Sequence, residues 1–513
     1  MSKLLLEAPT LWALLQQRVA LTPQALLCID GRSGQRLTFA QALDIAARLA
    51  AGFHQRGIGP GSVVTWQLPT GLPALMTALA LSRLGVIQNP IISLYGEREV
   101  LAILRRNGAQ FYLVPGVDGR DFPAMAEHIC QELEQPPEVI VMAGDLPQGK
   151  PSSLPPEPLD GDAVRWVYYT SGTTSEPKGA CHTDQTLMIG GRNLARSMLV
   201  SAADVGTVAF PYAHIGGAMY SCMLIASGMG AVLLDRFQPL EAMEIFRRYG
   251  VTATGGSTAH YEAFVAEQRH YGVEPLLPSL RLLCGGGAPR PPELYYAVRD
   301  VLGCPLLHNY GMTEVPLICA GSPGHDDEQL ACSEGLPVAD IELRIVRSDG
   351  SLAGVGESGE VRVRGKGVFK GYSDARLDAE AFDAEGFFRT GDLGLRRADG
   401  RVTLTGRLKD MIIRKGENIS AKEIEDLLYA HPQVGAVAVI GLPDAERGER
   451  VCAVVEIKEG QAAITFDEMV AYCKAARIMR QKIPEQLEVV DHLPRSESLG
   501  KVLKQALRER FSH

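Results

Sequence analysis

Between about residues 20 and 160 the chain alternates between segments with helical and strand-like patterns. Helices are expected at 37–56, 72–84 and 97–106, and short strands at 63–68, 86–90 and 110–114. In the first helix, the apolar stripe of Leu43, Ile45, Leu49 and Phe53 marks the buried face. A regular succession of strand, helix and strand favours a mostly parallel, doubly wound sheet. The predicted fold class is therefore α/β.

The composition is that of an ordinary globular protein. The 513 residues suffice for two or more domains of roughly 100–250 residues each. The net charge of −9 provides no basic footprint, so no nucleic-acid partner is expected. The ten cysteines contain no Cys-x-x-Cys pair, which favours dispersed reduced thiols in a cytoplasmic protein.

Two apolar stretches resemble membrane or targeting segments in length or composition. Residues 1–19 lack a basic start followed by a long apolar core, so an N-terminal helix packed on the body is expected in place of a signal peptide. Residues 215–234 contain no charge and are long enough to span a bilayer. Their Gly and Ser content favours a buried helix followed by a buried strand at 231–234. No integral membrane segment is expected.

A loop rich in small hydrogen-bond donors follows an expected strand at 163–169. It contains Thr170, Ser171, Gly172, Thr173 and Thr174. Backbone N–H groups in such a loop form a nest for an anion, and Lys178 adds a positive charge. The pattern is not that of a P-loop, because Lys178 precedes Gly179. A polar surface turn is the plain alternative, but the density of donors favours a phosphate clamp.

Three later motifs carry further groups suited to a nucleotide. Residues 280–283 are apolar except for Arg281 and lead through Cys284 into Gly-Gly-Gly-Ala-Pro, where a flat ring can lie against the backbone unless the segment is only a tight turn. In Asn-Tyr-Gly-Met-Thr-Glu (309–314), Tyr310 has a face for stacking and Glu314 has oxygens suited to Mg²⁺. Asp392 follows a glycine and can accept from both hydroxyls of a ribose, although an isolated Asp in a β-turn is common.

Residues 168–180 resemble the signature loop of the acyl-adenylate-forming (AMP-binding) superfamily, Thr-Ser-Gly-Thr-Thr-Gly-x-Pro-Lys-Gly. Ser175 occupies the place of the usual Gly. The other motifs follow in family order, and the resemblance covers nearly the whole chain. Within the superfamily the chain looks most like the acyl-CoA synthetase / fatty-acid–CoA ligase branch.

The resemblance implies a nucleotide site built from several motifs. The residues it assigns to ATP are Thr170, Ser171, Gly172, Thr173, Thr174, Lys178, Gly286, Gly287, Ala288, Pro289, Asn309, Tyr310, Gly311, Met312, Thr313, Asp392 and Arg407. It makes Lys501, Thr313 and Glu314 catalytic, with Glu314 as the Mg²⁺ ligand.

The resemblance also implies an acyl pocket, a hinge and a CoA contact. His214 is expected to close the acyl pocket, with Gly216 and Gly217 leaving room beside it. Lys409 is expected to be the hinge, and Gly416 to approach the pantetheine arm of CoA. The expected division is an N-terminal AMP-binding domain at 1–408, which includes a β subdomain, and a small mobile α+β lid at 409–513.

The segment 493–501 resembles the family's Pro-Arg-Thr-x-x-Gly-Lys ending, in which the lysine is catalytic. This chain has one extra residue between Ser496 and Gly500. Lys501 is the expected catalytic lysine, and Lys504 is the alternative.

The resemblance implies an ATP-dependent acid–thiol ligase. It would form an acyl-CoA from a medium-chain, fatty or alicyclic carboxylic acid through an acyl-AMP, using ATP, Mg²⁺ and coenzyme A and releasing AMP and pyrophosphate. One alternative is a stand-alone adenylation enzyme that loads a carrier protein. Another is a non-catalytic nucleotide-binding regulator. A homodimer is possible.

Overall fold

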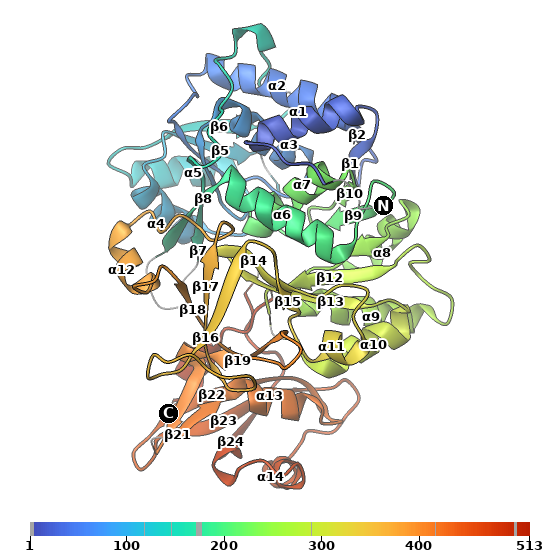
Figure 1. The fold of residues 1–513 in the computed structure, drawn as a ribbon, viewed down its shortest axis with the longest axis vertical. Coiled ribbons are helices and arrows are strands. Elements are labelled where there is room, and N and C mark those ends of the chain that lie inside the picture. The colour runs from blue at the N-terminus through green and yellow to red at the C-terminus, as the bar shows by residue number, and fades with distance from the viewer. Residues whose placement is uncertain are drawn as a thin grey trace.

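A large N-terminal domain built on several sheets lies next to a smaller C-terminal domain (Figure 1). The computed structural model describes residues 5–116, 118–144, 146–170, 177–288, 290–415, 417–496 and 500–512. The mixed α/β fold expected from the sequence is confirmed.

The first sheet has six strands in the order β6-β5-β3-β4-β7-β8. They are β3 (Val63–Trp66), β4 (Ile87–Pro90), β5 (Phe111–Pro115), β6 (Glu138–Met142), β7 (Val164–Thr170) and β8 (Lys178–Thr183). Its helices are α2 (Phe39–Gln55), α3 (Leu72–Leu84), α4 (Glu97–Asn107) and α5 (Phe122–Gln131). Neighbouring strands are parallel except β7 and β8, which form an antiparallel hairpin. Each helix and strand predicted in this region is present, whereas β8 was not predicted.

Two further sheets complete the body of the large domain. One has the order β2-β1-β10-β9 and the other β11-β12-β13-β14-β15. Their strands are β1 (Leu26–Asp30), β2 (Arg36–Thr38), β9 (Val205–Val208), β10 (Gly230–Leu233), β11 (Ala253–Thr254), β12 (Leu282–Gly286), β13 (Leu306–Met312), β14 (Val315–Ala320) and β15 (Leu336–Pro337). The helices around them are α1 (Leu11–Leu21), α6 (Asp184–Met198), α7 (Ile215–Ser227), α8 (Pro239–Arg248), α9 (Thr258–Tyr271), α10 (Pro292–Leu302) and α11 (Asp327–Ala331).

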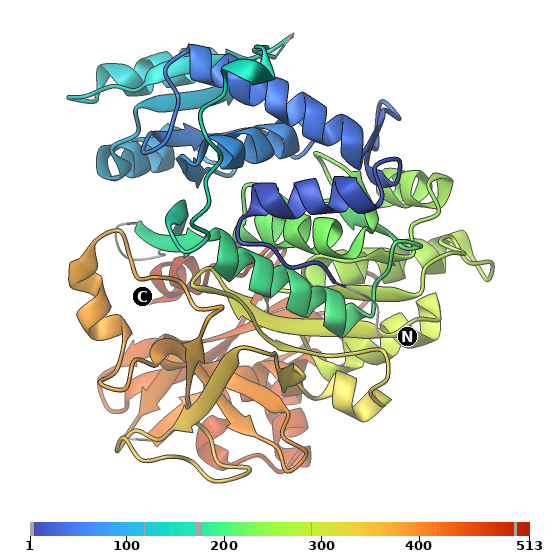
Figure 2. The ribbon, with the colours of Figure 1, turned by 45° about the horizontal axis from the view of Figure 1, so that its top comes forward.

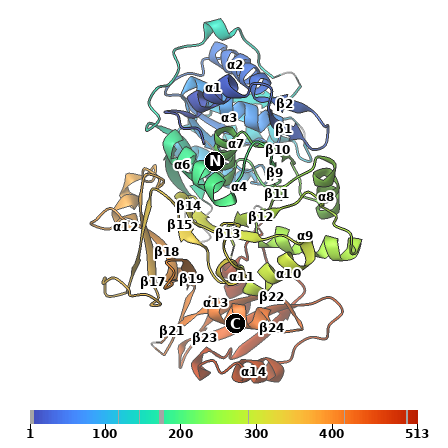
Figure 3. The same ribbon diagram turned by 45° about the vertical axis from the view of Figure 1, so that its right-hand side comes forward.

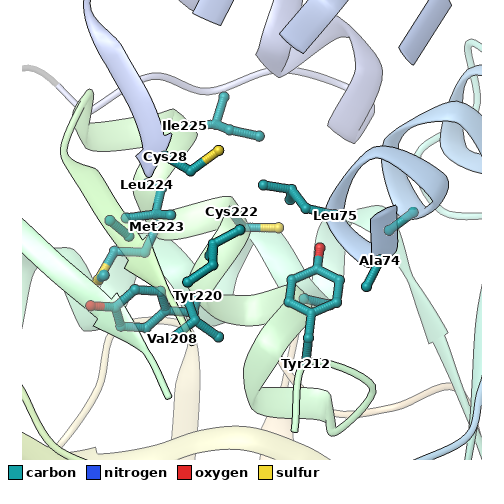
Figure 4. Close-up of a cluster of buried hydrophobic side chains, with 14 of the residues drawn as sticks. Cys28, Ala74, Leu75, Val208, Tyr212, Tyr220, Cys222, Met223, Leu224 and Ile225 are labelled. Carbon is teal, nitrogen blue, oxygen red and sulfur yellow. The ribbon is translucent and has the colours of Figure 1, made fainter. Parts of the chain in front are cut away.

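Helix α7 lies in the centre of the large domain, as predicted for an uncharged helix followed by a buried strand. It packs on α6 and α1 (Figure 2), and its apolar side chains join those of β1, α3 and β9 in one core (Figure 4). The close approach to α6 depends on Gly191, where a Cβ atom would lie 2.7 Å from the carbonyl oxygen of Met219. Within the described ranges, none of the helices combines the length and the apolar character needed to cross a bilayer.

A four-stranded antiparallel β subdomain follows, beside the third sheet (Figure 3). Its strands are β16 (Ile341–Val346), β17 (Gly359–Gly365), β18 (Phe388–Arg396) and β19 (Val402–Arg407). A short turn, η2 (Ala375–Leu377), and α12 (Asp378–Ala381) lie between β17 and β18. The β character predicted for 341–346 and 359–364 is thereby confirmed.

In its described residues the C-terminal domain has a five-stranded sheet, three α-helices and a 3₁₀ turn, η4 (Arg480–Lys482). Its elements are β20 (Met411–Arg414), β21 (Glu417–Ser420), α13 (Ala421–Tyr429), β22 (Val434–Asp444), β23 (Gly448–Ile457), α14 (Phe466–Ala475), β24 (Gln486–Val490) and α15 (Lys504–Phe511). Ser420 occupies the N-cap position of α13, but its hydroxyl donates to the carbonyl oxygen of Thr405 at 2.5 Å. This bond ties the start of the C-terminal domain to β19.

Candidate active site

The hairpin between β13 and β14 carries the two residues at the centre of the site. Met312 pairs with Val315, so Thr313 and Glu314 form the turn. The Nε2–H of buried His182, on β8, donates to the carbonyl oxygen of Thr313 at 2.8 Å. Burial lowers the pKa of His182 to about 4, so the imidazole is neutral at pH 7. Strand β8, which begins at Lys178, therefore holds this turn in place.

Glu314 is buried and already has one fixed partner. The hydroxyl of Tyr372 donates to its Oε1 at 2.7 Å. The Nζ of Lys178 lies 5.5 Å from the centroid of the same tyrosine ring. Tyr372 was not predicted as a site residue. It follows a glycine in a segment of no recognised local motif, so only the folded chain places it here.

The described residues fit a magnesium ion that is held mainly by phosphates. No group of three or more His, Cys, Asp or Glu ligands occurs in the described part of the chain. Glu314 supplies one carboxylate, whose Oε1 is engaged by Tyr372. Mg²⁺ typically binds proteins through one or two carboxylates, with water and substrate phosphates completing its shell. A single carboxylate is thus an adequate donor set if a nucleotide is bound.

Asp392 is held from two sides. The hydroxyl of Tyr310 donates to Oδ2 at 2.8 Å, and the Nε of Arg407 lies 2.8 Å from Oδ1. The pairing of β18 with β19 places Asp392 directly opposite Arg407. Asp392 is 3% exposed and Tyr310 is 6% exposed. Since a carboxylate oxygen accepts two hydrogen bonds, each oxygen keeps one acceptor position for a ligand.

The end of β12 gives close access to the backbone beside β13. Gly286 pairs with Asn309, whose carbonyl oxygen would lie 2.2 Å from an added Cβ. Gly287 is exposed, with φ +87° and open space where a side chain would be, and Ala288 is half-buried. The Nδ2 of Asn309 donates to Cys284 Sγ at 3.1 Å, while its buried Oδ1 has no hydrogen-bond partner among the described residues. This surface offers an unpaired acceptor next to a bare backbone.

His214 is the N-cap of α7, and its Nδ1 accepts from the N–H of Gly216 at 3.2 Å. Burial, together with the charge of Lys501, lowers the pKa of His214 to about 4. The room expected at Gly217 is not there: an added Cβ would lie 2.0 Å from the carbonyl oxygen of Tyr212. Gly217 is a close backbone contact, and only Gly216 faces the imidazole, at 3.3 Å. Gly311 is likewise a close backbone contact, because an added Cβ would lie 2.3 Å from the carbonyl oxygen of Pro316.

Lys501 lies within the electrostatic reach of the other charged groups of the site. Burial and the positive charges of Arg407 and Lys409 lower its pKa to about 8, against the opposing influence of Asp392 and Glu314. Lys504 is elsewhere, with its Nζ 2.6 Å from Glu425 Oε1. The structure thus brings Lys501, and not Lys504, to the predicted site.

The residues on either side of 497–499, the part that holds the extra residue and lies outside the described residues, are hydrogen-bonded to one another. Backbone hydrogen bonds join Ser496 N to Lys501 O at 2.7 Å and Gly500 N to Ser496 O at 2.8 Å. A bridge between Arg495 and Val502 closes the base of the loop. Lys501 therefore leaves the loop at a fixed point.

Lys409 is exposed in a short turn, η3 (Leu408–Asp410), which joins β19 to β20. It is thus the connection between the β subdomain and the C-terminal sheet. Six of the predicted site residues lie outside the described residues: Ser171, Gly172, Thr173, Thr174, Pro289 and Gly416. Thr170 is the last residue of β7, directly before the residues predicted to form the phosphate loop.

Comparisons with known proteins agree with this geometry. The AMP-binding enzyme family matches residues 15–373, and the AMP-binding enzyme C-terminal domain matches 423–501. Feruloyl-CoA synthase from Amycolatopsis sp. is 32% identical over 497 residues, covering 96% of this chain and 98% of its own. Salicyl-AMP ligase / salicyl-S-ArCP synthetase from Mycobacterium tuberculosis is 33% identical over 487 residues, covering 92% and 85%.

A solved structure shares this fold over nearly its whole length. O-succinylbenzoate coenzyme A synthetase (MenE) from Bacillus subtilis, in complex with ATP and magnesium ion, superposes with a TM-score of 0.84 at 28% identity, over 96% of this chain and 98% of the other. The chain therefore belongs to the AMP-binding enzyme family, the adenylate-forming group that includes acyl-CoA ligases.

Proposed function

We propose that the protein is an AMP-forming acid–thiol ligase that converts a medium-chain, fatty or alicyclic carboxylic acid into its CoA thioester. The observation that carries this proposal is the position of Lys501 among Asp392, Arg407 and Glu314. Lys501 is a half-buried cation near Asp392, the proposed ribose ligand, and Glu314, the proposed Mg²⁺ ligand. A cation in this position suits a reaction between the substrate carboxylate and the α-phosphate of ATP.

In the first step an oxygen of the substrate carboxylate attacks the α-phosphorus of ATP, and the bond to pyrophosphate breaks. The reaction needs positioned charge more than proton transfer. Lys501 bridges the carboxylate and the α-phosphate, and Lys178 with the loop from Thr170 to Thr174 holds the β- and γ-phosphates. Glu314, together with phosphate oxygens and assisted by Thr313, would hold Mg²⁺, whose charge stabilises the leaving pyrophosphate.

The nucleoside is held by the groups around β12, β13 and β18. Asp392 accepts from the ribose hydroxyls while Tyr310 and Arg407 fix its orientation. Gly286 to Pro289, with Gly311 and Met312, form the walls beside the adenine. The unpaired Oδ1 of Asn309 accepts from the adenine amino group.

In the second step the C-terminal domain rotates about Lys409, at the proposed domain boundary between residues 408 and 409. Lys501 leaves the site and the loop with Gly416 enters. The CoA sulfur then attacks the acyl carbonyl, and the bond to AMP breaks. Domain rotation of the hinge type lets one site perform both steps.

The acyl group lies beside Gly216 and the neutral imidazole of His214. A neutral ring next to a glycine suits an uncharged, sizeable acyl chain better than acetate. The similarity to a salicyl-S-ArCP synthetase supports a second candidate, in which the same acyl-AMP is transferred to a carrier protein.

The test is a panel of carboxylic acids assayed by exchange of labelled pyrophosphate into ATP and by mass spectrometry of CoA thioesters. Exchange and thioester formation with a medium-chain or alicyclic acid, without a protein partner, are expected. Exchange without a CoA product points to the carrier-protein candidate. ATP binding without AMP release for any acid would contradict both and favour a regulatory protein.

A further inference from the structure

The segment around Tyr372 is fixed by its backbone before its side chain reaches the site. Residues 369–373 run along β8 in the manner of an added strand. The bonds are Lys370 N to Cys181 O (2.8 Å), Cys181 N to Gly371 O (2.9 Å) and Ser373 N to Gly179 O (2.7 Å). The N–H of Tyr372 donates to Asp378 Oδ1 at 2.9 Å. The position of the tyrosine is therefore tied to the strand that begins with Lys178.

The Tyr372 side chain joins two groups that come from different sheets. Its hydroxyl donates to Glu314 Oε1 at 2.7 Å, and its ring centroid is 5.5 Å from Lys178 Nζ. Phe369 packs against the ring edge to face, with centroids 4.9 Å apart. The N–H of Phe369 also donates to the carbonyl oxygen of Glu314 at 2.9 Å. The same short segment thus contacts both the backbone and the carboxylate of Glu314.

These contacts restrict both charged groups. A hydroxyl that donates to a carboxylate forms a strong, directional bond, so it selects one rotamer of the buried Glu314. The face of an aromatic ring attracts a cation, so it limits the range of the flexible lysine stem.

We propose that Tyr372 is a positioning residue that holds the Glu314 carboxylate and the Lys178 ammonium in register for the triphosphate and its Mg²⁺. The proposal rests on the proposed function, because it assigns these two residues to the phosphate end of ATP. It adds a residue that couples Lys178, at the start of β8, to the β13–β14 turn. Tyr372 acts through its two partners and contacts no reacting atom.

The test measures binding of α,β-methylene-ATP to the full chain by calorimetry, with and without Mg²⁺. Tyr372→Phe keeps the ring and removes the donor. We expect its Kd with Mg²⁺ to rise about tenfold, as for loss of a hydrogen bond to a charged group. Without Mg²⁺ its Kd should match that of the unaltered protein, because the ring still limits Lys178.

Tyr372→Leu removes both contacts and separates the two roles. We expect a further loss of roughly two- to fivefold in affinity, which persists without Mg²⁺ because it acts through Lys178. The matched control is Tyr295→Phe, which removes a 2.6 Å hydrogen bond to Asp327 in α11. This control should leave nucleotide affinity unchanged.

A double substitution guards against a purely structural effect. In a Glu314→Gln background, Tyr372→Phe should have little further effect on the Mg²⁺-dependent affinity. Full additivity, an equal loss with and without Mg²⁺, or an unchanged Kd in Tyr372→Phe would each overturn the proposal. Because this binding needs no acid, the result stands even if no acid supports pyrophosphate exchange, which would refute only the proposed function.

Discussion

The hydroxyl of Tyr429 donates a 2.7 Å hydrogen bond to Glu262 Oε1, joining α13 of the C-terminal domain to α9 of the large domain. Helix α9 also lies beside the segment that carries Lys501, because a Cβ placed on Gly500 would lie 3.6 Å from the Cβ of Ala259 in α9. Burial raises the pKa of Glu262, and Arg495 opposes that rise. Helix α9 is therefore part of the interface between the two domains when Lys501 is in the site.

Tyr429→Phe should weaken this interface between α9 and α13 without changing any group at the reacting centre. A hydrogen bond to a carboxylate contributes about 1.5–3 kcal/mol when buried, and less at a half-buried interface. We expect pyrophosphate exchange to slow roughly three- to tenfold, while thioester formation from a supplied acyl-AMP keeps its rate. Tyr271→Phe, which removes a bond to Arg247 from the same helix, is the control. Equal slowing of both half-reactions would exclude a specific role of this interface in adenylation.

Lys501→Ala should abolish most adenylate formation and spare the second step. Removal of one positioned electrostatic group typically costs about 10²–10³ in rate. Lys504→Ala breaks only the pair with Glu425, so pyrophosphate exchange should stay within a factor of about three, as expected for a partly exposed ion pair. If the two variants lose exchange activity to the same degree, the assignment of Lys501 is wrong.

Replacing Lys409 with Pro should have the opposite pattern. The η3 turn joins the two domains, and proline fixes φ and removes the backbone N–H there. Thioester formation should fall more than pyrophosphate exchange, measured by quenched single-turnover assays of each step. A variant that loses exchange first would show that the rotation centres on another residue.

Adenylation should lose activity on the alkaline side of neutral pH. The pKa of Lys501 in the unliganded protein is lowered to about 8, so the ammonium predominates only below that pH. The kcat/KM for pyrophosphate exchange should therefore fall above pH 8, by about tenfold per pH unit once the lysine is neutral. Lys501→Arg keeps its charge to much higher pH. Its weaker activity should lack this alkaline decline, and a decline at the same pH would point to another group.

Gly216 and Gly217 should respond differently to the same substitution. Gly217→Ala forces a Cβ against the backbone carbonyl of Tyr212 at 2.0 Å, so it should lower the free energy of unfolding by about 1–3 kcal/mol. In Gly216→Ala the new methyl group lies 3.3 Å from His214 Nδ1 and 3.5 Å from the ring of Phe210. That variant should fold normally and prefer shorter acids. Thermal unfolding and the acid panel measure the two effects.

The strand and helix pattern of the large domain was predictable because each element carries its own signal. The helix expected at 72–84 has those bounds in the structure, and the strand expected at 110–114 is β5, one residue later. The β8 strand had no such signal. Its residues Lys-Gly-Ala-Cys-His-Thr form a strand through pairing with β7 and with residues 369–373, contacts that only the folded chain supplies.

The candidate site was predictable where a motif concentrates several functional groups, as in 309–314. Single residues that act from outside the motifs were missed. His182 and Tyr372 contact the β13–β14 turn from 131 and 58 residues away in sequence. Gly217 was expected to leave room in the acyl pocket, but the structure uses it for a close backbone contact. A glycine in a sequence is compatible with either role, and only the surrounding chain distinguishes the two.

The closed loop before Lys501 has a consequence for how this segment tolerates insertions. Leu503 N bonds to Pro494 O at 2.7 Å and a bridge pairs Arg495 with Val502, so these bonds hold the backbone of Lys501 whatever the number of residues between Ser496 and Gly500. Chain length at this point is thereby decoupled from the placement of the lysine. A label or affinity tag inserted between Ser496 and Gly500 therefore offers a site from which to follow the arrival and departure of Lys501.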